Sequence, residues 1–277
     1  MTYIFEKDRI YRMPTHFGPA PGPRQLPDEI AADPHAHPKR LTVSASFLTD
    51  AEKLERHLPA GFSLVGEPVV TIDFHYLTQI DWLAGRGYTM VHVSWPARFE
   101  GKEDAATGKF LAAVWENLAD PIITGRDEIG HPKLYAEVPP PRCFGAEHIC
   151  EASWMGFRFL EIGVSSDEDA ASEVAPSPQS ARSDGTLMLK YTPRTGDWGQ
   201  AELCQVTLTP LHDPYVKVER RHAGRARLRF NACTWSDLPT MAHVVNALAA
   251  LPIVEMRGGA VVHAHGGKPY RDQRVLR

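Results

Sequence analysis

The chain alternates between apolar and polar positions over long stretches, which is the pattern that predicts β-strands. In residues 69–77 every second side chain is large and apolar, and Asp73 and His75 fall on the opposite face. Residues 88–95 alternate in the same way, and His92 lies opposite the valines. Comparable strand-like segments occupy residues 147–164, 187–191, 201–208 and 216–231.

Helical patterns are fewer. Residues 49–52 read Thr-Asp-Ala-Glu and are typical of the start of a short helix, which would end near the proline and glycine of residues 59–61. Residues 238–251 are apolar on most faces and predict a buried helix. Many strands with few helices predict a β-rich α+β fold, either a barrel or a sandwich with helices at its ends.

Two stretches have no such pattern. Residues 13–38 are rich in proline and glycine, which disfavour regular helices and central strands. Residues 165–185 are rich in Ser, Ala, Asp, Glu and Pro. We therefore expect an extended arm at residues 1–38 and a single domain at residues 39–277, with a mobile surface loop at residues 165–185.

Composition narrows the classes of function. The chain has 277 residues, 43% of them hydrophobic, and a net charge of −4. That length supports a sizeable core, and the charge gives no basic footprint for nucleic acid or an anionic membrane. No apolar run approaches the roughly 20 residues that span a bilayer, and the N-terminal residues do not resemble a signal peptide. We expect a cytoplasmic protein.

Common cofactor and metal motifs are missing from the sequence. There is no dinucleotide fingerprint, no phosphate-binding Walker motif and no Gly-x-Ser-x-Gly elbow. The His-x-His pairs at residues 35–37 and 263–265 have the spacing of metal ligands on a strand, but no sequential third ligand accompanies them. We expect neither a metal nor a cofactor.

The segment with the most specific chemistry is residues 125–133, which read Gly-Arg-Asp-Glu-Ile-Gly-His-Pro-Lys. Pro132 restricts the backbone and favours an extended chain before it, so a helical turn followed by a strand is expected. By strand alternation, Lys133, Tyr135 and Glu137 would share one face. By its chemistry alone Lys133 would be an exposed lysine at the edge of a strand.

The same segment resembles the acetoacetate decarboxylase family, in which Gly-Arg-Glu, a four-residue spacer and Pro-Lys carry the Schiff-base lysine. The resemblance continues in the same order along the chain and covers roughly residues 40 to 262. The further matching segments are residues 39–41, 51–62, 67–69, Asp73, 154–158, 187–193, 224–228 and 251–255.

The resemblance implies a cone-shaped β-barrel with flanking helices, a pocket inside that barrel and a homo-oligomer whose proline-rich arm reaches a neighbour. It also implies that Lys133 is the nucleophile, a role that lysine acquires through burial or a nearby cation. Arg40 would hold a substrate carboxylate through two parallel hydrogen bonds. Asp73 would orient Arg40 or carry a proton.

Two departures from the family pattern concern the pocket. Members of the family carry a second lysine after the first, and this chain has Leu134 there. They also carry a glutamate on the second polar strand, where this chain has Met90. Tyr88 and His92 share the predicted face of Met90 and could transfer protons instead. Glu255 is a further candidate for the pocket wall.

The sequence thus predicts a Schiff-base lyase that acts on a small keto acid and binds it with Arg40, Asp73, Met90, Tyr88, His92 and Glu255 around Lys133. Decarboxylation of a β-keto acid is the leading hypothesis. An alternative, favoured by the loss of the glutamate at Met90, is aldol condensation with dehydration, or a related hydratase or cyclase reaction, on a pyruvate-like α-keto acid. A third hypothesis is a non-catalytic barrel that binds a small apolar acid and forms no covalent adduct.

Overall fold

The computed structural model describes residues 29–166, 183–268 and 270–277, together with residues 5, 10, 11, 13, 15–17, 26 and 27. Most of the expected loop at residues 165–185 lies outside the described residues, and so does much of the expected arm at residues 1–38. Both expectations therefore stay predictions.

Strands account for most of the described chain. They are β1 (Lys39–Leu48), β2 (Phe62–Leu64), β3 (Val69–Thr78), β4 (Tyr88–Glu100), β5 (Ala105–Glu116), β6 (Lys133–Tyr135), β7 (Arg142–Phe144), β8 (Glu147–Trp154), β9 (Phe157–Ser166), β10 (Gly185–Arg194), β11 (Asp197–Pro210), β12 (Lys217–Phe230), β13 (Glu255–His265) and β14 (Arg274–Leu276). The helical elements are η1 (Thr15–Phe17), α1 (Ala51–Glu55), η2 (Asp81–Leu83), α2 (Ala119–Thr124), η3 (Gly125–Ile129, a π-helix) and α3 (Ala242–Ala249).

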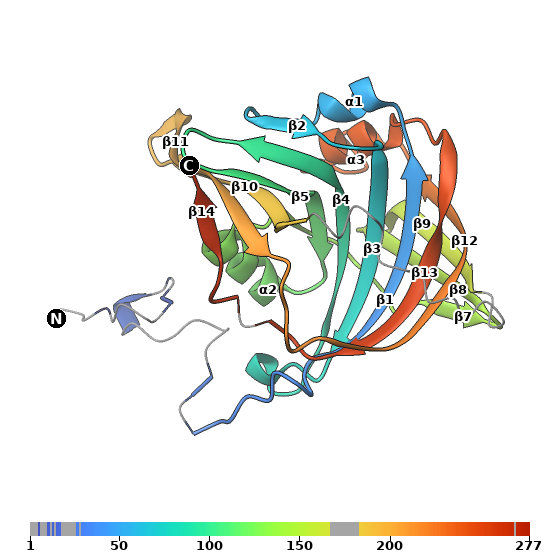
Figure 1. The fold of residues 1–277 in the computed structure, drawn as a ribbon, viewed down its shortest axis with the longest axis horizontal. Helices are drawn as coiled ribbons and strands as arrows, with labels where there is room; N and C mark the ends of the chain where they lie inside the picture. The colour runs from blue at the N-terminus through green and yellow to red at the C-terminus, as the bar shows by residue number, and fades with distance from the viewer. Residues whose placement is uncertain are drawn as a thin grey trace.

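The strands form one strongly curved sheet (Figure 1). Its order is β14-β11-β10-β5-β4-β3-β1-β13-β12-β9-β8-β7, and β2 and β6 pair beside this path with β4 and β5. Most neighbours are antiparallel, but β10 and β6 each run parallel to β5. Within the described residues the two end strands do not pair with each other, so the closed barrel implied by the family resemblance is not confirmed.

The curved sheet wraps around a large apolar core. Its central strands bury their apolar positions on one face, and side chains from distant strands meet there. The rings of Trp115 on β5 and Phe159 on β9, for example, lie 5.2 Å apart. Helix α3 covers this core with Val245 and Leu248. Each fully buried side chain of this size contributes about 1.5–3 kcal/mol relative to an exposed one, so this face dominates the folding energy.

The alternating patterns are confirmed as strands, and the differences have local causes. Residues 147–164 form two strands because Met155 and Gly156 adopt positive φ angles of 48° and 87° and turn the chain back. The helix predicted at residues 238–251 is shorter, at Ala242–Ala249. Asp50 caps α1 by accepting a hydrogen bond from the backbone of Lys53 at 2.8 Å, as the sequence predicted.

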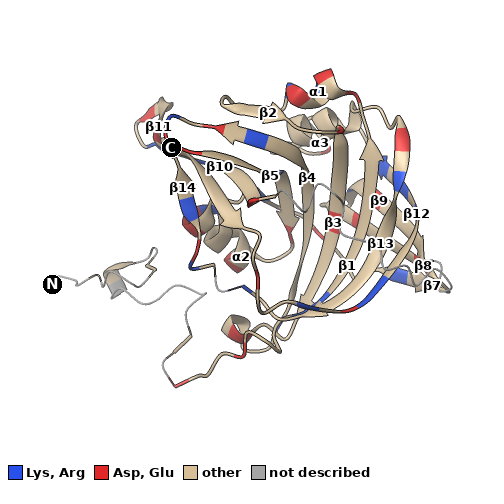
Figure 2. Cartoon of the chain, in the orientation of Figure 1, with Lys and Arg blue, Asp and Glu red and all other residues tan. Residues whose placement is uncertain are grey.

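Charge is distributed without a dominant sign. Acidic and basic residues are interspersed over the strands and loops in Figure 2, in keeping with the small net charge. No helix in the described part of the chain is long and apolar enough to cross a membrane.

Candidate active site

The central strands carry polar side chains on the face opposite the large apolar core. On β3, β4 and β5 these positions alternate with core residues, as the period of a strand requires. The residues that share this face are Arg40, Thr42, Ser44, Asp73, His75, Met90, His92, Val114, Glu116 and Lys133. Most of the expected site residues thus gather on the face of these strands that lies opposite the large core.

Strand register arranges part of this face in a row. Asp73 on β3 pairs with His92 on β4, His92 pairs with Val114 on β5, and Val114 pairs with Lys133 on β6. Neighbouring residues across such strands have Cβ atoms about 4.5–5.5 Å apart. A polar row therefore leads from Asp73 to the lysine, with only Val114 interrupting it.

Lys133 and Glu116 form a buried ion pair. The Lys133 Nζ lies 2.8 Å from a carboxylate oxygen of Glu116, and the two side chains are 2% and 0% exposed. Lys133 Nζ also donates a hydrogen bond of 2.8 Å to the carbonyl of Pro121 in α2. The exposed edge lysine suggested by local chemistry alone is therefore wrong, because the tertiary structure buries this amine and places a carboxylate against it.

The chain before Lys133 is shaped to accommodate its side chain. Gly125 ends α2 and begins the π-helix η3, and a Cβ there would lie 2.2 Å from Lys133 Cε, so only glycine leaves room. Gly130 then turns the chain with a φ of 78°. Arg126 donates a hydrogen bond of 2.9 Å to the Lys133 carbonyl, which joins the turn to the start of β6.

The strands β10 and β11 hold this turn from the other side. Lys190 Nζ donates hydrogen bonds to the carbonyls of Asp127 and Glu128. The Thr207 hydroxyl donates one of 3.0 Å to the carbonyl of Ile129. These bonds satisfy carbonyls at the end of a short helix that lack partners within it. The position of Lys133 thus depends on strands more than 50 residues further along the chain.

Glu116 was missed by the sequence reasoning. It is the direct cross-strand partner of Met90, the position where the family glutamate was expected. A carboxylate is therefore present beside the lysine but comes from the adjacent strand. The signal that could have found it is a glutamate that ends the apolar run of residues 110–115.

The other departure from the family pattern also has a structural reason. Leu134 pairs with Trp115 and packs against the large core, on the face opposite Lys133. A second lysine at this position would point into apolar surroundings. Here leucine suits the core, and the site retains a single lysine.

Asp73 and His75 are held by hydroxyl groups of β1. Ser44 Oγ donates a hydrogen bond of 2.5 Å to an Asp73 carboxylate oxygen. Thr42 Oγ1 lies 2.8 Å from His75 Nδ1. The ring of His92 lies next to His75, with centroids 4.7 Å apart in an edge-to-face arrangement. Sequence alternation predicted that Asp73 and His75 share one face of residues 69–77 and that His92 lies on the polar face of residues 88–95. The strand register brings these two faces together.

Both histidines are neutral at neutral pH. Burial lowers the pKa of His75 to about 3, and the positive charge of Arg40 acts in the same direction. Burial also lowers the pKa of His92 well below its usual value, with further lowering from His75, Lys133 and Arg40 and an opposing effect from Asp73. The polar face therefore offers two uncharged imidazoles.

Arg40 lies at one end of the same face. It is part of β1 rather than before it, and its cross-strand neighbour is Leu77, which pairs in turn with Tyr88. The Arg40 side chain makes no hydrogen bond or ion pair with any described residue, so its guanidinium can bind an anion. Tyr88 shares this row and packs near Trp82, with ring centroids 6.3 Å apart.

Glu255 is not brought to the other predicted site residues. It begins β13 and pairs with Leu48, at the far end of β1 from Arg40. Its side chain is 57% exposed and lies 3.6 Å from Arg257 in an ion pair. The structure therefore gives no support for Glu255 as part of the pocket wall.

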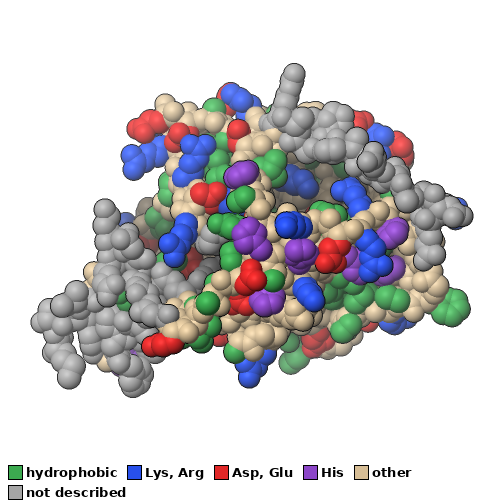
Figure 3. All heavy atoms as spheres, turned by 60° about the horizontal axis from the view of Figure 1, so that its bottom comes forward, with side chains coloured by type: hydrophobic (Ala, Val, Ile, Leu, Met, Phe, Trp, Pro, Cys, Tyr) green, Lys and Arg blue, Asp and Glu red, His purple; other side chains and the backbone are tan. Residues whose placement is uncertain are grey.

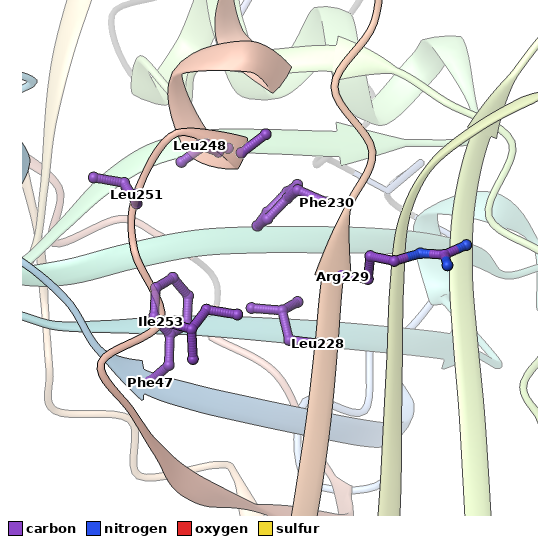
Figure 4. Close-up of a pocket in the computed structure, with 8 residues that line it drawn as sticks. Phe47, Leu228, Arg229, Phe230, Leu248, Leu251 and Ile253 are labelled. Atoms are coloured by element: carbon purple, nitrogen blue, oxygen red, sulfur yellow. The ribbon is translucent and has the colours of Figure 1, made fainter.

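A separate apolar pocket lies beside α3, near the end of β1 and the start of β13 (Figure 4). Its volume is about 140 Å³, and it is lined by Phe47, Leu228, Arg229, Phe230, Leu248, Ala249, Leu251 and Ile253. Arg229 points away from the other labelled side chains. The lining of this pocket includes no nucleophile and no paired acid and base.

Several histidines gather on the face turned forward in Figure 3. The two His-x-His pairs meet where β1 begins and β13 ends, since His265 pairs with Lys39 and its Nδ1 lies 2.6 Å from the His35 carbonyl. His37 Nδ1 contacts Asp81 at 2.7 Å. Among the described residues no group of three potential ligands is arranged to hold a metal ion.

Comparison with known proteins gives a consistent result. The sequence matches the family model of acetoacetate decarboxylase over residues 12–265. No curated protein sequence matches the chain significantly.

Three solved structures illustrate the structural similarity. Acetoacetate decarboxylase from Legionella pneumophila is 19% identical with a TM-score of 0.68, and the alignment covers 99% of this chain and 98% of that one. An acetoacetate decarboxylase-like enzyme from Sphingomonas wittichii RW1 is 16% identical with a TM-score of 0.64, covering 89% and 94%. The enduracididine biosynthesis enzyme MppR complexed with pyruvate is 17% identical with a TM-score of 0.62, covering 90% and 92%. At these identities the similarity establishes the fold.

Proposed function

Because this chain belongs to the acetoacetate decarboxylase family, we propose that it is a Schiff-base-forming lyase that acts on a small keto acid. The observation that carries the proposal is the buried Lys133 amine, 2.8 Å from the Glu116 carboxylate. An amine that can lose its proton and an adjacent base that accepts it are what a lysine nucleophile needs. The mechanism uses side chains alone and requires no cofactor. We propose that the protein acts in the cytoplasm as a homo-oligomer.

The first step is a proton transfer within the ion pair. Glu116 accepts a proton from the Lys133 ammonium, and the neutral amine attacks the carbonyl carbon of the keto acid. Loss of water then leaves an iminium that joins the substrate to Nζ. The contact of 2.8 Å places the two groups within reach for this transfer. The buried site also strengthens the electrostatic interaction between the pair and the substrate.

Decarboxylation of a β-keto acid follows directly from the iminium. The bond between the α-carbon and the carboxylate breaks, its electron pair forms the double bond of an enamine, and carbon dioxide leaves. Arg40 binds a carboxylate group during substrate entry, because its guanidinium has no partner among the described residues. Asp73, fixed by Ser44, organises the polar row between Arg40 and the lysine.

A second candidate is condensation of a pyruvate-like α-keto acid with an aldehyde, followed by dehydration. MppR, which shares the fold, has been solved in complex with pyruvate and with a condensation product of pyruvate and imidazole 4-carboxaldehyde. In this chain Met90 replaces the expected strand glutamate, and the carboxylate comes from Glu116 instead. Because the carboxylate of the site lies on a different strand from the one expected, pyruvate should be tested together with acetoacetate.

Borohydride trapping tests the proposal. The protein is incubated with acetoacetate or pyruvate and borohydride, and its intact mass is measured. We expect an adduct with at least one keto acid, absent from Lys133→Ala and retained in Lys102→Ala, a matched control at an exposed lysine. Release of carbon dioxide from acetoacetate would identify the decarboxylase. A conjugated, ultraviolet-absorbing product from pyruvate and an aldehyde would identify the condensation.

Removal of Lys133 alone takes the counter-charge away from the buried Glu116 carboxylate and destabilises the fold. The double variant Lys133→Met with Glu116→Gln removes both charges and serves as a second lysine-free protein. An adduct that persists in either lysine-free protein would contradict the role of Lys133. The absence of an adduct from the wild-type protein with both keto acids would favour a barrel that only binds acids.

A further inference from the structure

One titratable group on the polar face remains unused in the proposed function. His92 Nε2 is buried and has no hydrogen-bond partner among the described residues. The neighbouring polar groups are engaged in pairs: Ser44 with Asp73, Thr42 with His75, and Glu116 with Lys133. A buried polar atom without a partner costs free energy, so its presence at a site calls for a functional explanation.

His92 lies within the polar row, between Asp73 and Lys133. Its ring is 4.7 Å from that of His75 and 6.4 Å from that of His131, which precedes Lys133 by two residues. Across the sheet, only Val114 separates His92 from Lys133. Two strand spacings amount to about 10 Å between the backbones. A lysine side chain that carries a short keto acid can cover this separation, so the attached substrate reaches the imidazole.

His92 is in the uncharged form, which is the form that can accept a proton. Its pKa is held well below the usual value by burial first, then by His75 and by the positive charges of Lys133 and Arg40, while Asp73 acts in the opposite direction. Thr42 fixes one nitrogen of the adjacent His75, which limits how the two rings can turn. At neutral pH His92 is therefore an uncharged imidazole with a nitrogen that can accept a proton.

We propose that His92 is the base that removes a proton from the carbon next to the iminium carbon. The carbon–hydrogen bond breaks, and the proton binds His92 Nε2. The electron pair of that bond forms the double bond of an enamine, and the electron pair of the carbon–nitrogen double bond returns to nitrogen. The reverse step returns the same proton to carbon. This inference rests on the proposed Schiff-base function and assigns a further catalytic residue to it.

The assignment defines a class of substrate. The keto acid or ketone must carry at least one hydrogen on the carbon next to its carbonyl, since otherwise His92 has nothing to remove. Pyruvate and acetone both satisfy this condition. The enamine they form is a carbon nucleophile, so a site with this base is equipped for condensation as well as for decarboxylation.

Hydrogen exchange tests the assignment. The protein is incubated with pyruvate or acetone in heavy water, and the loss of the methyl proton signal is followed by nuclear magnetic resonance. His92→Gln is compared with wild type and with His57→Gln, a control at an exposed histidine. We expect His92→Gln to slow exchange by roughly 10²–10⁴-fold, the usual contribution of a general base. Borohydride trapping with the same compounds, run in parallel, should be retained.

The two measurements separate the possible outcomes. Retained trapping with exchange near the wild-type rate would overturn the role of His92. Loss of trapping in a folded His92→Gln protein would overturn it too, because His92 would then act before the iminium forms. No trapping in the wild-type protein would refute the proposed function and this inference with it. If His92→Gln fails to fold, His92→Phe takes its place, because phenylalanine fills a similar space and cannot accept a proton. The same outcomes of trapping and exchange then decide.

Discussion

At the scale of single residues, the buried ion pair of Lys133 and Glu116 is the contact on which the proposed function rests. Two buried charges lose their hydration, and their mutual attraction recovers that loss only while both are present. The pair is therefore a poor device for stability but a good one for chemistry, because a proton can move across 2.8 Å. Apolar side chains of similar volume would stabilise such a buried position at least as well as an ion pair does.

This view predicts an asymmetry between single and double substitutions. Glu116→Gln should lower the free energy of unfolding by about 3–5 kcal/mol, because Lys133 stays buried without its counter-charge. Adding Lys133→Met should recover most of the loss, since the buried charge is gone. Denaturant unfolding of the three proteins measures the effect. Equal stability of the single and the double variant would show that the amine finds another partner.

At the scale of elements, the π-helix η3 positions the lysine, and β10 and β11 position η3. π-Helical turns are uncommon and occur frequently at functional sites. Here the turn follows α2 without interruption, and its carbonyls are bound by Lys190 and Thr207 rather than by a longer helix. The turn before β6 is thus fixed by α2 on one side and by β10 and β11 on the other. This restricts the directions in which the Lys133 side chain can point.

Loss of one of these bonds should affect the site as well as stability. Thr207→Val removes the hydrogen bond to the Ile129 carbonyl at a buried position, at a cost of about 1–3 kcal/mol. We expect slower formation of the borohydride-trapped adduct, because η3 then holds Lys133 less firmly. Thr192→Val, on the exposed part of β10, is the matched control. Reduced stability with an unchanged adduct rate would limit Thr207 to a structural role.

At the scale of the whole molecule, the fold separates two tasks between the faces of one sheet. One face encloses the apolar core, and the other carries histidines, acids and the lysine. The neutral buried histidines link folding to pH. The pKa of His75 is about 3 in the folded protein against an ordinary value of 6.5. Between these values the unfolded chain binds a proton that the folded protein does not, so acid favours unfolding.

The stability of the protein should therefore fall as the pH decreases from about 6.5 toward 3, and His75 should contribute nothing above that window. His75→Asn removes this contribution and should flatten the decline, by up to about 2 kcal/mol at pH 5. Unfolding by denaturant across this range measures it. The exposed His57→Asn variant should decline like wild type. An unchanged slope in His75→Asn would place the sensitivity in His92 or elsewhere.

The sequence by itself determined the strand-rich character, the common face of Asp73 and His75 on one strand, and the segment that carries Lys133. These features are local, since the period of a strand and the geometry before a proline need no distant partner. Only the tertiary structure decided that Lys133 is buried, that Glu116 lies against it, and that Glu255 lies elsewhere. Each depends on which strands pair and in what register. Register is set by contacts between distant parts of the chain, and alternation along one strand does not reveal it.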